Sequence, residues 1–343
     1  MIGAEVDVHD LSVSNLDTLA RRAISQPLLT HIHTADASAH VFEGRIYIYP
    51  SHDIDGGAPF DDDGGHFCME DYHVLRQDAP DGEAVDCGQV LHVRDVPWAE
   101  RQMWAPDAAY RDGRYYLYFP AKQADGLFRI GVAVGDGPAG PFVPEATPIE
   151  GAYSIDPAVF ADDDGEQYLY FGGIWGGQMQ KYRDNVHDAA HGEPADDQPA
   201  LGPRVARLDA GMKTLAEPSR EILILDANGE PLRAGDHARR YFEGPWIHRF
   251  QGRYYLSYST GNTRLLCYAV GDNPYGPFTY QGVLLEPVVG WTTHHSIVAF
   301  GGKWWLYYHD ALLSGGVTHL RTVKVAELQH DADGAIRTIK PYG

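Results

Sequence analysis

Short stretches of Tyr, Phe, Val and Ile alternate with turns rich in Gly, Pro and Asp along most of the chain. This pattern predicts β-strands, whereas the periodicity of amphipathic helices is nearly missing. Residues 11–30 hold the one stretch that predicts a short helix. Because helical segments do not separate the predicted strands, the βαβ architectures of Rossmann and TIM-barrel proteins are disfavoured.

A repeated unit, in which a Gly and a polar residue lead into an aromatic strand, indicates the fold. Its five copies begin at Gly44, Gly113, Gly165, Gly252 and Gly302. A second repeat, AVGDGPAGPF at 133–142, returns as AVGDNPYGPF at 269–278. Irregularly spaced copies of this kind predict blades of four antiparallel strands. We therefore predict an all-β fold, a five-bladed β-propeller, in preference to a β-sandwich.

The expected domain organisation follows from this ring. Residues 31–343 should form a single propeller domain, which closes on itself and so removes exposed sheet edges. Residues 1–30 should form an N-terminal segment that packs on the propeller or closes it. The least regular stretch, 181–240, predicts a long surface insertion, either over the site, at a subunit contact, or as a variable solvent loop. Functional groups should be scattered along the sequence, one per blade.

The charge balance restricts the partners. Acidic residues outnumber basic ones 48 to 27, a net charge of −21 that disfavours nucleic acid and anionic membranes. No window approaches 18 consecutive apolar residues, so no bilayer-spanning helix is predicted. The first residues, MIGAEVDVHD, have neither a basic nor an apolar leader region, and we expect a cytoplasmic location. Three scattered cysteines without a CxxC pair fit reduced packing residues.

Common catalytic motifs are absent from the sequence. It contains no P-loop, GxGxxG, GxSxG or HExxH motif. The 17 histidines do not combine with acidic or Cys partners at ligand spacing, which disfavours zinc catalysis. Most carboxylates fall in predicted hairpin tips, such as 61–63 and 162–164. The candidate chemistry therefore rests on the few carboxylates that lie elsewhere.

Three carboxylates lie among apolar, aromatic or small residues just before a predicted strand, each in a different blade: Asp36, Asp156 and Glu243. Burial in such surroundings favours the neutral acid, as a proton donor requires. One such acid alone is most often structural, but the repeated placement indicates a joint function. Paired carboxylates with aromatic walls are typical of glycoside hydrolysis. Candidate aromatic platforms for a sugar are Trp104, Trp175, Trp246 and Trp291.

Five short motifs give the sequence a family resemblance. They are TADA at 34–37, WAPD at 104–107, SIDP at 154–157, FEGP at 242–245 and THHS at 293–296. In this order, over about residues 30 to 325, the chain resembles glycoside hydrolase family 43. That family comprises five-bladed propellers, among them β-xylosidases, α-L-arabinofuranosidases and arabinanases. Two positions depart from its usual pattern, Ala37 in place of Pro and Thr293 in place of Gly.

The resemblance implies roles for the three acids. Asp36 resembles the general base and Glu243 the general acid of the family. Asp156 resembles the third acid, which raises the pKa of the donor and orients it.

The resemblance also implies contacts around these acids. Arg321 resembles the arginine that contacts sugar hydroxyls. His294 resembles the histidine beside a divalent metal, usually calcium, at the propeller axis. Trp104, Trp175 and His295 are candidates for further substrate contacts.

The segment FGGIWGGQ at 171–178 resembles the branch of single-domain, metal-stimulated β-xylosidases. We therefore expect an inverting exo-glycoside hydrolase that releases xylose from the non-reducing end of β-1,4-xylo-oligosaccharides, with side activity on α-L-arabinofuranosides. The alternatives are a main activity as α-L-arabinofuranosidase or arabinanase, and a non-catalytic carbohydrate-binding propeller. The expected binding partner is a xylo-oligosaccharide or arabinoside substrate. A homo-oligomer is a further expectation.

Overall fold

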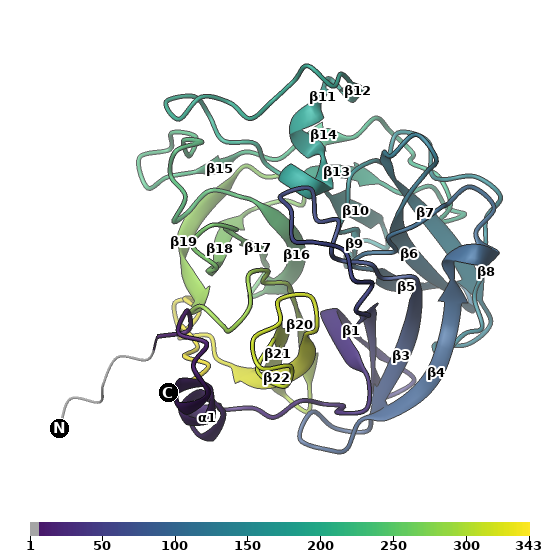
Figure 1. Cartoon of the computed structure of the whole chain (residues 1–343). Helices are drawn as coiled ribbons and strands as arrows, with labels where there is room; N and C mark the ends of the chain where they lie inside the picture. Colours follow the sequence, from purple (N-terminus) through teal and green to yellow (C-terminus); the bar gives the residue numbers. More distant parts are fainter. Residues whose placement is uncertain (1–6) are drawn as a thin grey trace.

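Five antiparallel sheets surround a central axis in the computed structural model, which describes residues 7–343 (Figure 1). The first blade contains β1 (His33–Phe42), β2 (Arg45–Asp53), β3 (Asp71–Gln77) and β4 (Val85–His92). The second contains β5 (Asp107–Arg111), β6 (Arg114–Lys122), β7 (Phe128–Gly135) and β8 (Val143–Pro144). The third contains β9 (Ala158–Ala161), β10 (Gln167–Phe171), β13 (Arg204–Arg207) and β14 (Arg220–Glu221).

The last two blades complete the ring. The fourth contains β16 (Glu243–Phe250), β17 (Arg253–Ser259), β18 (Leu266–Gly271) and β19 (Phe278–Leu285), with β15 (Ile224–Leu225) parallel to β19 at its outer edge. The fifth contains β20 (His295–Phe300), β21 (Lys303–Asp310) and β22 (Thr322–Leu328). The predicted five-bladed propeller is confirmed.

The Gly-aromatic repeat occupies the same place in every blade. Each copy supplies the turn after the first strand and then the second strand: β2, β6, β10, β17 or β21. The five repeat glycines all have positive φ, between 75° and 86°. Glycine adopts this backbone conformation without strain because it has no Cβ, so a glycine at this position allows the tight turn to close. The second repeat also folds alike in its two copies, each with a cis Gly-Pro bond, at 140–141 and 276–277.

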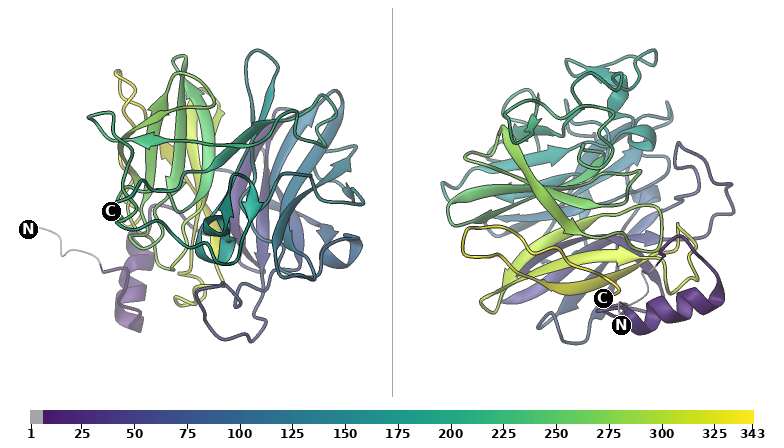
Figure 2. Two further views of the ribbon diagram at one scale, coloured as in Figure 1. Left: turned by 90° about the horizontal axis from the view of Figure 1, so that it is seen from above. Right: turned by 90° about the vertical axis from the view of Figure 1, so that its left-hand side faces the viewer.

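The innermost strands close the ring in sequence order. Strand β1 contacts β5, β5 contacts β9, β9 contacts β16, β16 contacts β20, and β20 contacts β1. The two side views show the blades standing around this axis (Figure 2). At the seam between the last and first blades, the backbone N–H of Thr34 donates to the carbonyl of Arg321 at 2.9 Å. Residues far apart in the sequence therefore meet at one end of the axis.

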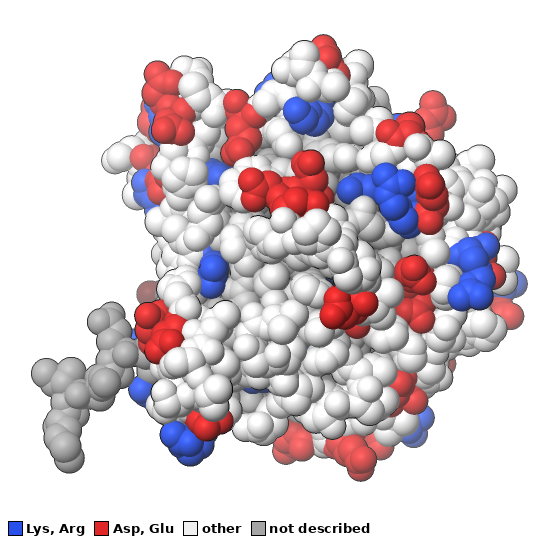
Figure 3. Space-filling view, viewed as in Figure 1, with Lys and Arg blue, Asp and Glu red and all other residues white. Residues whose placement is uncertain are grey.

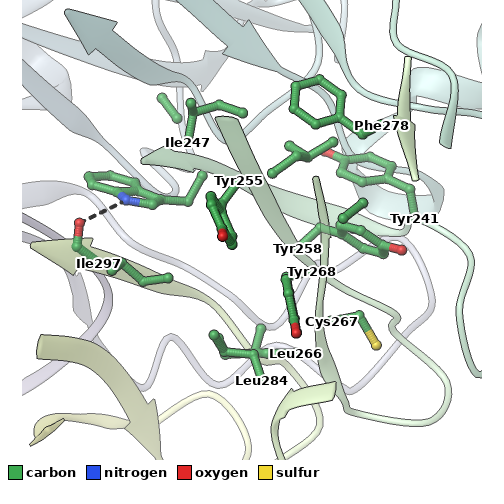
Figure 4. Close-up of a cluster of buried hydrophobic side chains, with 14 of the residues drawn as sticks. Tyr241, Ile247, Tyr255, Tyr258, Leu266, Cys267, Tyr268, Phe278, Leu284 and Ile297 are labelled. Carbon is green, nitrogen blue, oxygen red and sulfur yellow. Dashed lines mark hydrogen bonds between the residues drawn. The ribbon is translucent and has the colours of Figure 1, made fainter. Parts of the chain in front are cut away.

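Aromatic and aliphatic side chains fill the space between adjacent blades. In the fourth blade, Tyr255, Tyr258 and Leu266 belong to one buried cluster, which continues to Ile297 of the fifth blade (Figure 4). The indole N–H of Trp246 donates to the Ile297 carbonyl at 3.1 Å across this interface. Trp246 is thus a core residue between blades, and its candidacy as a sugar platform was wrong.

The N-terminal helix α1 (Val13–Arg22) packs on the outside of the ring beside the C-terminus (Figure 1). Leu19 is fully buried against Val289, Ala311 and Tyr342. The first six residues of the expected 1–30 segment lie outside the described residues. Within residues 7–343, no helix is both long and apolar enough to cross a membrane.

The stretch 181–240 is more structured than the sequence predicted. It supplies β13, β14 and β15, which form outer strands of the third and fourth blades. It also holds the short pair β11 (Tyr182–Arg183) and β12 (Val186–His187). The prediction of one long insertion was therefore wrong for these strands. They are too short to give a periodic signal. The chain also forms three single 3₁₀ turns, η1 (Val93–Asp95), η2 (Trp175–Gly177) and η3 (Met179–Lys181).

A buried ion pair in the fifth blade generates a test of stability. Lys324 Nζ lies 2.7 Å from Asp310 Oδ2, which also accepts from the Tyr342 hydroxyl at 2.9 Å, and the Lys324 and Asp310 side chains are at most 2% exposed. Lys324→Met should lower the free energy of unfolding by about 3–5 kcal/mol, because it leaves a buried carboxylate unpaired. The matched control is Lys303→Met, which removes the exposed pair to Glu327 and should change little. Equal midpoints for both variants in urea unfolding would contradict this account.

Candidate active site

The three predicted acids lie at the same end of the axis, where the inner strands of three blades begin. Asp36 follows the start of β1 and has a φ of 52°, within a register shift between Ala35 and Ser38. Asp156 lies two residues before β9 and has a φ of 56°. Glu243 opens β16, beside a second register shift that ends at Trp246. Such irregularities re-aim a side chain out of the sheet alternation, here toward the axis.

The three carboxylates line one cavity of about 270 Å³. The structure therefore brings the three acids together, as the sequence predicted. The 54–70 loop between β2 and β3 crosses in front of the centre of the ring and forms one wall (Figure 1). The segment 174–177 and the loop before β20 also line the cavity, and Gly176 lies against Asp63 of the 54–70 loop. On this face of the molecule uncharged side chains cover much of the middle, with acidic groups beside it and further charged side chains around the periphery (Figure 3). The cavity thus suits a small neutral ligand with polar groups.

Asp36 is held in its ionised form. Its two carboxylate oxygens accept from Arg321 Nη1 at 2.9 Å and Nη2 at 3.1 Å, and Oδ2 also accepts from Ser51 Oγ at 2.7 Å. Burial, the largest single effect, raises the pKa of Asp36, but the Arg321 charge acting together with His309, His294 and the Ser51 hydrogen bond lowers that pKa to about 2. Asp36 is therefore a carboxylate throughout the neutral range and can accept a proton.

Arg321 is itself fixed by a second carboxylate, that of Asp53. Asp53 Oδ2 accepts from Arg321 Nε at 2.8 Å, and Oδ1 accepts from Nη2 at 2.8 Å. The remaining N–H of Nη1 donates to Thr292 Oγ1 at 2.9 Å. All five guanidinium N–H groups are thus used within the protein. Arg321 lines the cavity, but none of its N–H groups is free to donate to a sugar hydroxyl, contrary to what the resemblance had implied. Its guanidinium charge instead favours the ionised form of Asp36.

The other two acids have the opposite tendency. Burial, followed by the nearby charge of Asp36, raises the pKa of Asp156 well above its ordinary value. Burial and the charges of Asp156 and Asp36 do the same to the pKa of Glu243. Asp156 Oδ2 also accepts the backbone N–H of Gly244 at 2.9 Å, a bond that favours its ionised form. This bond is made to Asp156 and not to Glu243, which favours Glu243 as the proton donor.

Aromatic rings line the cavity beside Glu243. Trp175 and Trp291 stack with ring centroids 5.7 Å apart, and Phe242 packs edge-on against both. Trp175 has a φ of 56°, a strained conformation for a bulky residue, and such strain occurs at functional sites. Its indole N–H donates to Glu193 Oε1 at 2.6 Å, so the irregular 181–240 stretch reaches this wall.

Trp104 lines the cavity from the second blade. Its indole N–H donates to the Phe67 carbonyl at 3.0 Å, and its ring packs on Phe128. The predicted platforms Trp104, Trp175 and Trp291 are thus all placed at the cavity.

The two adjacent histidines lie in different surroundings. His294 lines the cavity, with Nε2 at 3.9 Å from Asp156 Oδ2. His295 is fully buried behind it, where Nε2 contacts Ser257 Oγ at 2.6 Å. The expected substrate contact of His295 is therefore wrong, because side chains of successive residues point in opposite directions.

His294 also fits a metal ion at the axis. Both of its ring nitrogens are buried without a hydrogen-bond partner among the described residues. Burial lowers the pKa of its imidazole, so the ring is neutral and offers a lone pair. Carboxylates lie on the same cavity, and a cation there would have compensating charge. The donor set is thus compatible with one protein nitrogen and a shell completed mainly by water.

Several cavity residues escaped the sequence analysis. Phe60, Asp61, Asp62 and Phe67 line the cavity, whereas the Asp run at 61–63 was expected to be a solvated hairpin tip. The one sequence signal for this loop was the glycine at position 64. In the structure Gly64 has a φ of 71°, and a Cβ added there would lie 2.5 Å from the Trp104 ring. Asp53 and Ser51 were missed because their partners lie more than 10 residues away in the sequence or in another blade.

Comparisons with known proteins agree with this geometry. Residues 86–336 match the model of the family described as glycosyl hydrolases family 43. A β-xylosidase from Xylanibacter ruminicola is 57% identical over 310 residues, 90% of this chain and 97% of the relative. The crystal structure of a GH43_1 enzyme from Xanthomonas citri complexed with xylotriose has a TM-score of 0.93 and 68% identity, and the match covers 96% of this chain and 98% of that chain.

A further structure comes from a compost microbial metagenome. It is a GH43 β-xylosidase/α-arabinofuranosidase in complex with xylotriose, in a calcium-free form. Its TM-score is 0.91 with 61% identity, and the match covers 93% of this chain and 98% of that chain.

Proposed function

Because the chain belongs to glycosyl hydrolase family 43, we propose that it is an inverting β-xylosidase that releases xylose from the non-reducing end of β-1,4-xylo-oligosaccharides, with side activity on α-L-arabinofuranosides. The observation that carries the proposal is a pair of buried carboxyl groups in one cavity with opposed pKa shifts, in Asp36 and Glu243. Such a pair is what glycoside hydrolysis needs.

Each acid has one part in the proposed mechanism. Asp36, kept ionised by Arg321, accepts a proton from the water that attacks the anomeric carbon. Glu243, kept protonated by burial and by the charges of Asp156 and Asp36, donates its proton to the leaving oxygen. Attack opposite the leaving group inverts the anomeric centre, so a β-xyloside gives α-xylose first. Asp156 lies on the same cavity and raises the pKa of Glu243, because two neighbouring buried carboxyl groups cannot easily both be ionised.

The two alternative functions differ in how the site supports them. A carbohydrate-binding propeller would use the aromatic wall, but it would not need three buried acids with divergent pKa values. An α-L-arabinofuranosidase would use the same acids, because L-arabinofuranose and D-xylopyranose present similar hydroxyl arrangements. We place β-xylosidase first because the β-xylosidase from X. ruminicola is 57% identical along 97% of its length. Association into a homo-oligomer and a cytoplasmic location stay predictions.

We also propose that the axis holds a divalent cation, calcium, with His294 as its protein ligand. Support comes from the unpartnered nitrogens of His294 and from the calcium-free form in which the metagenomic relative was crystallised. When bound, the cation supplies a positive charge that favours the ionised form of nearby carboxylates. Calcium otherwise prefers oxygen ligands, so water should occupy most of its shell.

Product analysis on xylobiose tests the main proposal. Proton NMR in the first minutes should show α-xylose ahead of its mutarotation to the β-anomer. The value of kcat/KM for p-nitrophenyl β-xyloside should exceed that for p-nitrophenyl α-L-arabinofuranoside. Asp36→Ala should remove nearly all turnover while leaving the unfolding transition cooperative. Binding of xylobiose without hydrolysis would favour the carbohydrate-binding alternative, and β-xylose as first product would rule out inversion.

The pH profile tests the assignment of the acid. Activity should fall at high pH as Glu243 loses its proton, and Asp36 should not limit activity near neutral pH because its pKa is about 2. Asp156→Asn removes one charge that raises the pKa of Glu243, so the alkaline limb of kcat/KM should move to lower pH.

The matched control is Glu243→Gln. This substitution should abolish the alkaline limb and lower kcat/KM on xylobiose by about 10²–10⁴-fold. The loss of kcat/KM should be smaller on aryl xylosides, because their leaving groups need less protonation. An unmoved limb in Asp156→Asn, or equal losses on both substrates, would contradict the assignment.

Chelation tests the axial cation. Exhaustive dialysis against EDTA should lower kcat/KM several-fold, and added CaCl₂ should restore it. His294→Ala should already have the lower activity and should respond to neither treatment. The proposal is overturned if dialysed wild-type protein retains full activity and calorimetry detects no calcium binding.

A further inference from the structure

We propose a second metal site, on the first blade, in which His52, Asp71 and His73 bind a zinc-class divalent cation. It is separate from the axial position of His294. Among the described residues 7–343, these three side chains form a group of potential ligands compact enough to hold a metal ion. One ligand atom from each lies within 4.8 Å of the others.

The observed distances fit the expected coordination. His52 Nδ1 lies 2.7 Å from Asp71 Oδ1, and His73 Nε2 lies 3.9 Å from Asp71 Oδ2. The two imidazole rings meet edge to face with centroids 4.9 Å apart. Tetrahedral zinc, with bonds of about 2.0–2.2 Å, separates its ligand atoms by roughly 3.3 Å. Small side-chain rotations therefore bring the three atoms to coordination distance.

A second carboxylate orients His73. Asp86 accepts from His73 Nδ1, with Oδ1 at 3.0 Å and Oδ2 at 3.2 Å. The backbone N–H of Gly88 and the ring of His31 also contact this carboxylate, at 2.8 Å and 3.3 Å. A carboxylate is an acceptor, so Nδ1 carries a proton, and in the neutral ring the lone pair of Nε2 points toward Asp71. This carboxylate–histidine pair is the usual outer support of a metal-binding imidazole.

The lone pair of His73 Nε2 faces a carboxylate oxygen, a contact between two acceptors. These two groups repel each other unless a second proton on the ring or a cation lies between them. A divalent cation resolves the conflict, because it binds both groups and replaces the proton shared by His52 and Asp71. Two imidazole nitrogens and one carboxylate oxygen are a typical zinc donor set, whereas calcium and magnesium prefer oxygen ligands alone.

The sheet places these ligands by its register. Ser51 of β2 pairs with Tyr72 of β3, so His52 lies opposite Asp71, and His73 follows on the same face as Asp71. The three side chains are 12–19% exposed, which leaves a water molecule access to the fourth coordination position. The cation would thus tie β2 to β3 next to Asp53, which anchors Arg321.

Calorimetry with ZnCl₂ tests the site, on untagged protein dialysed against EDTA. The His294→Ala variant is the starting protein, because it removes the axial position. It should bind one zinc ion, and its Tm should rise by about 3–5 °C at a zinc concentration a hundredfold above Kd. Cobalt(II) should give the visible absorption of a four-coordinate nitrogen and oxygen site.

Two substitutions in that background separate ligation from folding. His73→Asn keeps an amide donor for Asp86 but removes the ligand atom Nε2, and zinc binding should be lost. Asp86→Asn leaves all three ligands and should weaken zinc binding about 10–100-fold. The control His187→Asn changes a histidine of β12 outside the cluster and should bind zinc normally. If His73→Asn fails to fold cooperatively, the weakened zinc binding of Asp86→Asn alone tests the site.

Two results would overturn the proposal. One is the absence of zinc binding to the His294→Ala protein, which would leave a hydrogen-bonded network that holds only protons. The other is unchanged zinc affinity in both His73→Asn and Asp86→Asn, which would place the zinc elsewhere. Neither result bears on the hydrolysis of xylobiose, so this proposal and the proposed function fail separately.

Discussion

The site depends on one buried ion-pair cluster, the guanidinium of Arg321 between the carboxylates of Asp36 and Asp53. Taking these charges out of water is costly, and the structure offsets the cost with paired, well-aligned hydrogen bonds to every donor of the arginine. Arg321 immediately precedes β22 of the last blade, whereas Asp36 and Asp53 lie in the first. The same contact therefore bridges the seam of the ring and fixes the charge of the proposed base.

The ionised state of Asp36 in turn shapes the other two acids. All three carboxyl groups are buried, so desolvation alone would keep all of them neutral. Only Asp36 has an arginine bound to it, and its negative charge then adds to the burial that raises the pKa values of Asp156 and Glu243. Similar side chains thus acquire opposite protonation states through their partners. This division of roles is what acid and base catalysis in one cavity requires.

The fold could be predicted because its signal is local and repeated. A turn glycine followed by an aromatic strand needs only neighbouring residues, and its recurrence gave the number of blades. The three acids could be found for the same reason, since each lies at or near the start of an inner strand. The errors concern neighbours in space. His295 and Trp246 were assigned to the substrate, but strand alternation and blade packing turn both away from the cavity.

The sequence by itself determined the class of fold, the blade count and the identity of the three acids, because these follow from local patterns and from motif order. Only the tertiary structure decided which carboxylate is ionised, because that depends on Arg321, which lies 285 residues from Asp36 in the chain. It likewise decided that the 54–70 loop forms a wall of the cavity and that His52 meets His73. Charge and desolvation act through space, and closing the ring is what sets those distances.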